Sequence, residues 1–143
     1  MPVNPLLLPE DQLVRAILIV RGKYDFAVDG GAISTIAITA GLPIPSGSVV
    51  VGGYVDITTG LTSGGAATIA CQVEAANDIL TAVAVASWTT GRKNVLPAPT
   101  TGALTASTAV KTTADRNISL VIAAATLTAG VANVVLYVVP PLV

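Results

Sequence analysis

Residues 49–74, VVVGGYVDITTGLTSGGAATIACQVE, show most directly how this chain folds. Residues 49–58 are rich in valine and isoleucine, which favours a β-strand. The adjacent Gly52 and Gly53 lie inside this run and predict a bulge or a sharp bend in the strand. A bend of this kind would let one strand turn the corner of a sandwich.

The second half of the stretch predicts a hairpin partner for that strand. Residues 61–65, LTSGG, have the composition of a longer, glycine-containing connection. Residues 66–74 then read as the returning strand, in which Ile69, Cys71 and Val73 share one face. The lone cysteine of the chain therefore falls on an apolar face, as expected of a buried small hydrophobic residue.

Strands and turns continue in both directions from this hairpin. Asn77 or Asp78 could cap a short helix, whereas Val83 and Val85 alternate as in a strand, so residues 77–88 fit a short helix or an irregular turn leading into strand. About eight short strands without helical crossovers predict an all-β, antiparallel sandwich or barrel. The further predicted strands are residues 15–26, 32–39, 107–112, 117–124 and 131–139; 127–130 is predicted as a tight turn, and 42–48 and 89–105 as loops.

The length of 143 residues suits one domain. Residues 1–12 carry three prolines and predict an extended N-terminal arm, which leaves residues 13–143 as a single β-sandwich domain. The arm lacks the basic start of a signal peptide, and glycines and prolines interrupt every apolar run too early for a membrane helix. We therefore expect no membrane partner.

The composition points to a protein that buries surface against other proteins. Hydrophobic residues make up 52% of the chain, charged residues only 10%, and the mean hydropathy is +0.78. A typical soluble domain is about 25% charged. Large exposed apolar patches imply partners or aggregation. The net charge of −1 gives no basic field for nucleic acid, so no nucleic-acid partner is expected.

The chain lacks the side chains that most enzymes use. It has no histidine and a single cysteine, which removes the Ser-His-Asp arrangement and zinc sites, and we expect no enzyme activity, no metal and no cofactor. Asp25 and Asp29 form the one local carboxylate cluster, but Asp29 is explained by the turn at Asp29–Gly31. Paired glycines elsewhere match no nucleotide-binding motif.

Three places concentrate apolar or anchor-type side chains and are the candidate protein interfaces. Trp88 followed by two cations fits an interface anchor, because Trp and Arg carry much interface energy; it equally fits a tryptophan at the core edge with solvated charges. Both ends of the chain are apolar, and a neighbouring subunit could bury them. The candidate interface residues are Leu6, Leu7, Leu8, Trp88, Arg92, Lys93, Pro140 and Leu142.

The runs YDFAVDGGAISTIAI, IPSGSVVVGGYVDITTGLTSGGAATIA and LTAGVANVVLYVV resemble small virion proteins of tailed bacteriophages, the head decoration or cement proteins among them. The resemblance covers about residues 24–139. It implies a jelly-roll-like sandwich on the surface of a phage head, where it would act as a homotrimer, bind the major capsid protein and reinforce capsomer junctions. Such a protein would be made in the host cytoplasm, which fits the scarcity of cysteine.

Two alternatives remain open at this point. The same β-architecture also serves in tail, baseplate and fibre proteins of phages. A carbohydrate-binding β-sandwich module belongs to a different class, and it usually presents aromatic platforms, for which the five aromatic residues of this chain offer little material.

Overall fold

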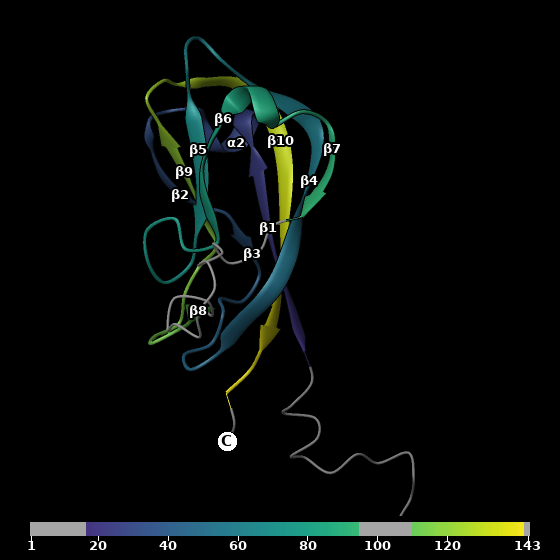
Figure 1. The fold of residues 1–143 in the computed structure, drawn as a ribbon, viewed down its shortest axis with the longest axis vertical. Coiled ribbons are helices and arrows are strands. Elements are labelled where there is room, and N and C mark those ends of the chain that lie inside the picture. Colours follow the sequence, from purple (N-terminus) through teal and green to yellow (C-terminus); the bar gives the residue numbers. More distant parts are fainter. Residues whose placement is uncertain (1–16, 95–109, 142–143) are drawn as a thin grey trace, which may run out of the picture.

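The computed structural model describes residues 17–94 and 110–141, which form two antiparallel β-sheets packed face to face (Figure 1). Sheet A has the strand order β3-β1-β10-β4-β7, with the short β8 paired to β4, and sheet B has the order β2-β9-β5-β6. Sheet A comprises β1 (Leu18–Asp25), β3 (Thr39–Ala40), β4 (Val49–Ser63), β7 (Gly91–Asn94), β8 (Val110–Lys111) and β10 (Leu127–Val139). Sheet B comprises β2 (Ser34–Ala37), β5 (Thr68–Gln72), β6 (Leu80–Ala84) and β9 (Ser119–Ala123).

The strand pairing is nested from the ends of the chain inward. β1 pairs with β10, β2 with β9, β4 with β7, and β5 with β6. The chain thus behaves as one long antiparallel hairpin folded over into two sheets, which is the topology of a jelly roll. The predicted all-β, jelly-roll-like antiparallel sandwich is confirmed. No helix in residues 17–94 and 110–141 is long and apolar enough to cross a membrane.

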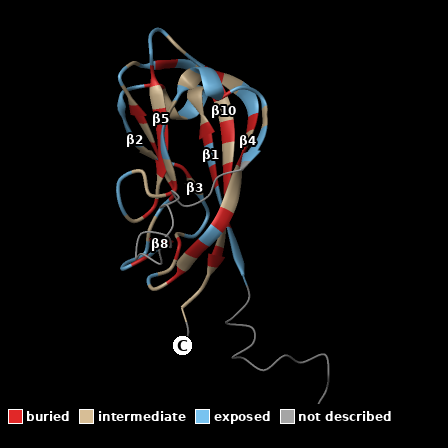
Figure 2. Cartoon of the chain, viewed as in Figure 1, coloured by how far each residue is buried: buried red, intermediate tan, exposed pale blue. Residues whose placement is uncertain are grey.

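The two sheets enclose one apolar core because their long strands alternate. Along β1, Val20, Gly22 and Tyr24 are buried while Arg21 and Lys23 are exposed. Figure 2 shows the buried positions as red bands along β1, β4, β5 and β10. The largest fully buried side chains are Tyr24, Ile44, Ile57, Ile69, Ile79, Ile118, Leu120, Ile122 and Leu136. Cys71 belongs to the same core, as its sequence context predicts.

One edge of the sandwich is closed by a strand that passes between the sheets. β2 belongs to sheet B and β3 to sheet A, and Ile38 lies between them. The Ile38 N–H donates to the Ile118 carbonyl at 2.9 Å, and the Ile38 carbonyl accepts from the Lys23 N–H at 2.8 Å. The predicted strand 32–39 is therefore two strands, because its backbone changes partner at Ile38.

Glycines permit two irregularities in the central strands. The register between β4 and β10 shifts between Tyr137 and Val138, where Val51 is the extra residue beside Gly52, so the predicted bulge is confirmed. Gly130 has a φ of +133°, and a Cβ there would lie 2.6 Å from Leu61 Cγ. Neither the dihedral angle nor the space suits another residue.

Several predicted boundaries are wrong. Residues 127–130 are the start of β10 and not a turn, since three register shifts between Leu127 and Ala132 absorb the irregular backbone around Gly130. β4 extends to Ser63, so the hairpin connection begins later than residue 61. Residues 91–94, predicted as loop, form β7 on the edge of sheet A. Residues 80–84 form β6 and lead into η1 (Val85–Ser87), so the turn-into-strand alternative describes this segment.

The short helix α2 (Phe26–Asp29) was not predicted, and it occupies the turn after β1. The predicted strand at 107–112 is described only from Val110, where β8 forms. The arm at 1–12 lies outside the described residues.

Candidate interaction surface

The acidic side chains around α2 are engaged in holding the turn together. The Asp25 carboxylate accepts from the Ala27 N–H at 3.1 Å and lies 3.2 Å from Lys23 Nζ. The Asp29 carboxylate accepts from the Asp25 N–H at 2.8 Å. Both carboxylates therefore cap and brace a turn, which matches the structural explanation of this pair. Within the described parts of the chain, no group of three or more His, Cys, Asp or Glu residues could hold a metal ion.

Cys71 lies on β5 of sheet B, and its side chain is fully buried in the core. Burial raises the pKa of its thiol to about 12, and the nearby Asp78 charge adds to the rise. A thiol in this state is not a nucleophile at neutral pH.

The three residues of the predicted Trp88 cluster do not form one surface. Trp88 is 3% exposed and belongs to the core, so the core-edge interpretation describes it. Lys93 lies at the mouth of a cavity and donates to Thr89 Oγ1 at 3.3 Å. Arg92 is exposed on the outer face of sheet A, with its guanidinium 4.7 Å from the centre of the Tyr54 ring. The alternation of β7 separates these two cations onto opposite faces of the strand.

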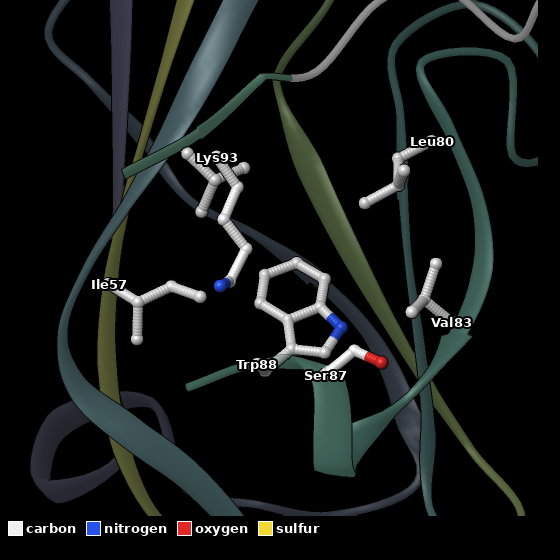
Figure 3. Close-up of a pocket in the computed structure, with 7 residues that line it drawn as sticks. Ile57, Leu80, Val83, Ser87, Trp88 and Lys93 are labelled. Atoms are coloured by element: carbon white, nitrogen blue, oxygen red, sulfur yellow. The ribbon is translucent and has the colours of Figure 1, made fainter. Parts of the chain in front are cut away.

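Trp88 fills the open edge of the sandwich between β6 and β7. Its carbonyl accepts from the Leu61 N–H at 3.0 Å, which ties η1 to β4. Beside the indole lies an apolar cavity of about 110 Å³ between the two sheets. In Figure 3 the indole stands between Leu80 and Val83 on one side and Ile57 and Lys93 on the other. The cavity continues the core to the edge, and Ser87 and Lys93 are the only polar residues among the described residues that line it.

The outer face of sheet A carries most of the described positive charge and two of the tyrosines. All lysines and arginines of the described residues except Arg116 lie on its strands. Cross-strand pairing places Tyr54 opposite Val135, and Tyr54 and Tyr137 have ring centroids 6.3 Å apart. Tyrosine and arginine are the residue types that anchor protein interfaces. Sequence reasoning missed Tyr54 and Tyr137, although the alternation of β4 puts Tyr54 on the same side as Asp56.

The outer face of sheet B has the opposite character. Its four strands, STIA, TIACQ, LTAVA and SLVIA, contain no charged residue. The pairing of β5 with β9 directs Thr68, Ala70 and Gln72 outward together with Ser119 and Val121. Such a face is uncharged, and little side-chain entropy is lost when small residues are covered.

A network of polar contacts fixes the loops at the end of the sandwich where β4 begins. Arg116 donates from Nε and Nη2 to the two oxygens of Glu74, both at 2.8 Å, and Thr113 donates to the same carboxylate. These hydrogen bonds lower the pKa of Glu74 to about 2. The Asp115 carboxylate accepts from the Ser46 N–H at 2.9 Å. Loops from three parts of the chain are therefore held in one arrangement.

The C-terminal candidates lie at this same end. Pro140 is half-buried, and a Cβ on Gly47 would lie 3.1 Å from Pro141 Cβ, so the end of the chain rests against the 45–48 loop. Leu142 and the arm residues Leu6, Leu7 and Leu8 lie outside the described residues.

No protein-family model matches the sequence, and no curated protein matches it. The fold is similar to chains in three solved phage capsids. A chain of the cyanophage Pam1 capsid asymmetric unit matches with a TM-score of 0.59 and 16% identity, over 87% of this chain and 85% of that one. A chain of the acid-stable capsid of Helicobacter pylori bacteriophage KHP30 matches with a TM-score of 0.56 and 13% identity, over 89% and 90%.

A chain of the Ralstonia phage GP4 capsid matches with a TM-score of 0.57 and 17% identity, over 87% of this chain and 84% of that one. At such identities the likeness concerns the fold. It extends over nearly the whole of each chain.

Proposed function

We propose that this protein is a structural component of a phage virion that decorates and stabilises the head. One observation carries the proposal: the jelly roll matches, over most of its length, chains of three phage capsids. The outer faces of the sandwich support it, since one is uncharged and the other carries tyrosine and arginine. A protein with this role works through contact area, and its described surface has two extended sheet faces to offer.

The physical task of such a protein is to hold neighbouring capsid subunits together. Packaged DNA strains the shell, and a protein that binds only the expanded lattice stabilises that lattice by mass action. The proposed binding site is the junction between capsomers, the partner is the major capsid protein, and the proposed form is a homotrimer. The rigid loop end around Glu74 and Arg116 suits such a contact, because a preorganised surface loses little entropy on binding.

The proposal is tested by adding the purified protein to expanded heads that lack it. We expect saturable binding to the heads, with antibody-labelled particles showing it on the head surface. Labelling confined to tails or baseplates would contradict the head assignment and favour the tail alternative. Failure to bind either would contradict the virion role.

A matched pair of variants identifies the face that contacts the shell. Val121→Lys places a charge on the uncharged outer face of sheet B, whereas Val28→Lys places one on α2, where Val28 is already 81% exposed. Loss of head binding in the first variant alone would assign sheet B to the capsid contact. Equal binding by both variants would exclude the outer face of sheet B and leave sheet A or the loop end around Glu74 and Arg116 as the contact.

A further inference from the structure

The start of β1 has an unpaired edge. β1 pairs with β10 along its whole length, but on its other side β3 pairs only with Arg21 and Gly22. Among the described residues, Leu18, Ile19 and Val20 therefore have no strand beside them on that side. An exposed strand edge is a template for pairing with another chain, and natural proteins cover or blunt it.

This edge borders an apolar groove of about 370 Å³. The groove is lined by the first residues of β1 and, across from them, by Ala40, Leu42, Pro43 and Pro45. Leu42 is 86% exposed and Ile19 is 56% exposed. The edge is thus apolar as well as unpaired, and no charged side chain protects residues 18–20.

A second groove of about 410 Å³ continues from the first one. Arg21 and Ala40 line both, and the second groove extends over the outer face of sheet A past Lys23, Tyr54 and Asp56. Arg21 is exposed, and no described carboxylate lies within ion-pair distance of it. Over the length of a few residues the lining of the combined groove changes from apolar to charged, and Arg21 is its cation without a described acidic partner.

We propose that this combined groove binds the N-terminal segment, residues 1–12, of a second copy of the chain. The segment has a matching change of character, with Leu6, Leu7 and Leu8 followed by Glu10 and Asp11. The segment runs parallel to β1, with its leucines beside the apolar edge and its carboxylates near Arg21 and Lys23. The recognition mode is strand addition to a sheet edge.

The prolines of the segment fit this arrangement. Pro5 and Pro9 lie four residues apart, so in an extended segment both point their backbone nitrogen to the same side. An added strand can turn that side away from β1, so that the N–H groups of Leu6 and Leu8 face β1 and can donate hydrogen bonds to it. The Lys23 N–H donates to the Ile38 carbonyl on this edge, so by alternation Ile19 also presents its N–H there. Parallel pairing then places Leu8 level with Leu18 and Asp11 level with Arg21, where β3 takes over the edge.

The geometry of the chain favours a second copy over the same copy. In this register Asp11 lies level with Arg21, and residues 12–16 alone would have to bring the chain back to Ile17 at the start of β1. Six Cα–Cα steps from Asp11 to Ile17 reach about 21 Å at full extension. The return along β1 alone takes about 13 Å, and a connection between parallel neighbours in one sheet usually needs a dozen residues or more. Too little chain remains for the two reversals of direction.

Cross-linking of the full-length chain tests the proposal in solution. One preparation carries Leu8→Cys, a second, isotope-labelled preparation carries Leu42→Cys, and the mixture is treated with a short bismaleimide after subunit exchange. We expect a link between positions 8 and 42 that joins a labelled to an unlabelled chain. The control replaces Leu42→Cys by Val28→Cys, on the exposed α2, and we expect at least a tenfold loss of the link.

Two outcomes of the cross-linking experiment would overturn the proposal. A third preparation carries both substitutions on one chain, and a link between positions 8 and 42 found only within its single chains would overturn the proposal in favour of a folded-back arm. A yield no higher than that of the Val28→Cys control would overturn it as well. The buried Cys71 gives no background, since its thiol is inaccessible.

Charge reversal provides an independent test. We expect Glu10→Lys with Asp11→Lys to weaken self-association several-fold in sedimentation, and Arg21→Glu with Lys23→Glu to restore it. Absence of restoration would contradict the assigned direction of the segment. These tests need no capsid. Their failure would leave the proposed virion role untouched, and failure of the head-binding test would leave the proposed self-association untouched.

Discussion

Replacing Trp88 by alanine removes the largest side chain at the open edge of the sandwich. Trp88 is 3% exposed, and a buried tryptophan removes about 150–250 Å² from water, worth about 4–6 kcal/mol at 25 cal/mol per Å². Measured Trp→Ala substitutions in protein cores cost about 3–5 kcal/mol. A cavity of about 110 Å³ already lies beside the indole, so part of the ring has few contacts to lose. We therefore expect a loss of about 3 kcal/mol, at the lower end of that range.

Urea unfolding followed by far-UV circular dichroism measures this loss. Trp88 is the one tryptophan of the chain, so its own fluorescence cannot report on the variant. Protein concentration has to be equal in all samples, because self-association adds to apparent stability. Val28→Ala serves as control at an 81% exposed position and is expected to change stability by less than about 0.5 kcal/mol. A Trp88→Ala cost below about 1 kcal/mol would refute the assignment of Trp88 to the core.

Three further predictions follow from the same structure. Gly130→Ala introduces a clash and a strained φ of +133° and should cost more than about 2 kcal/mol in urea unfolding, whereas Gly64→Ala, with open space around its Cβ, should cost less than about 1 kcal/mol; similar values would contradict the packing at Gly130. The pKa of Glu74 falls from 4.5 to about 2 on folding, so its ion pair with Arg116 stabilises the protein above about pH 4.5 and loses that effect as the pH falls to 2. The difference in Tm between the wild type and Glu74→Gln should shrink over that pH window, and a constant difference would contradict the pairing. Cys71 should react with a thiol reagent at neutral pH only after urea unfolding, and rapid reaction of the native protein would contradict its burial.

Strands with a clear β composition could be predicted from the sequence. Strands that exist because of their backbone pairing could not. β1, β5, β9 and the second half of β10 alternate strongly, and their positions were predicted within a few residues. β7, with the sequence GRKN, has no apolar alternation and exists because its backbone pairs with β4. Residues 127–130 looked like a turn because of Gly130, yet that glycine packs against Leu61 inside a bulged strand.

The candidate surface could be predicted only in part for a related reason. The absence of histidine and the scarcity of charge are visible in the sequence itself. The contrast between the two outer faces depends on which strands are neighbours, since Tyr54 and Arg92 meet through the pairing of β4 with β7. Trp88 and Arg92 looked like one cluster in the sequence, but η1 and the start of β7 direct them to opposite sides of sheet A.

Quantitative mass spectrometry of purified heads, freed of tails, tests most sharply the proposal that this chain is a multi-copy component of a phage head. We expect a fixed, high ratio of this chain to the major capsid protein, retained after removal of loosely bound protein. Absence of the chain from such heads, or its presence at only a few copies per particle, would contradict the proposal.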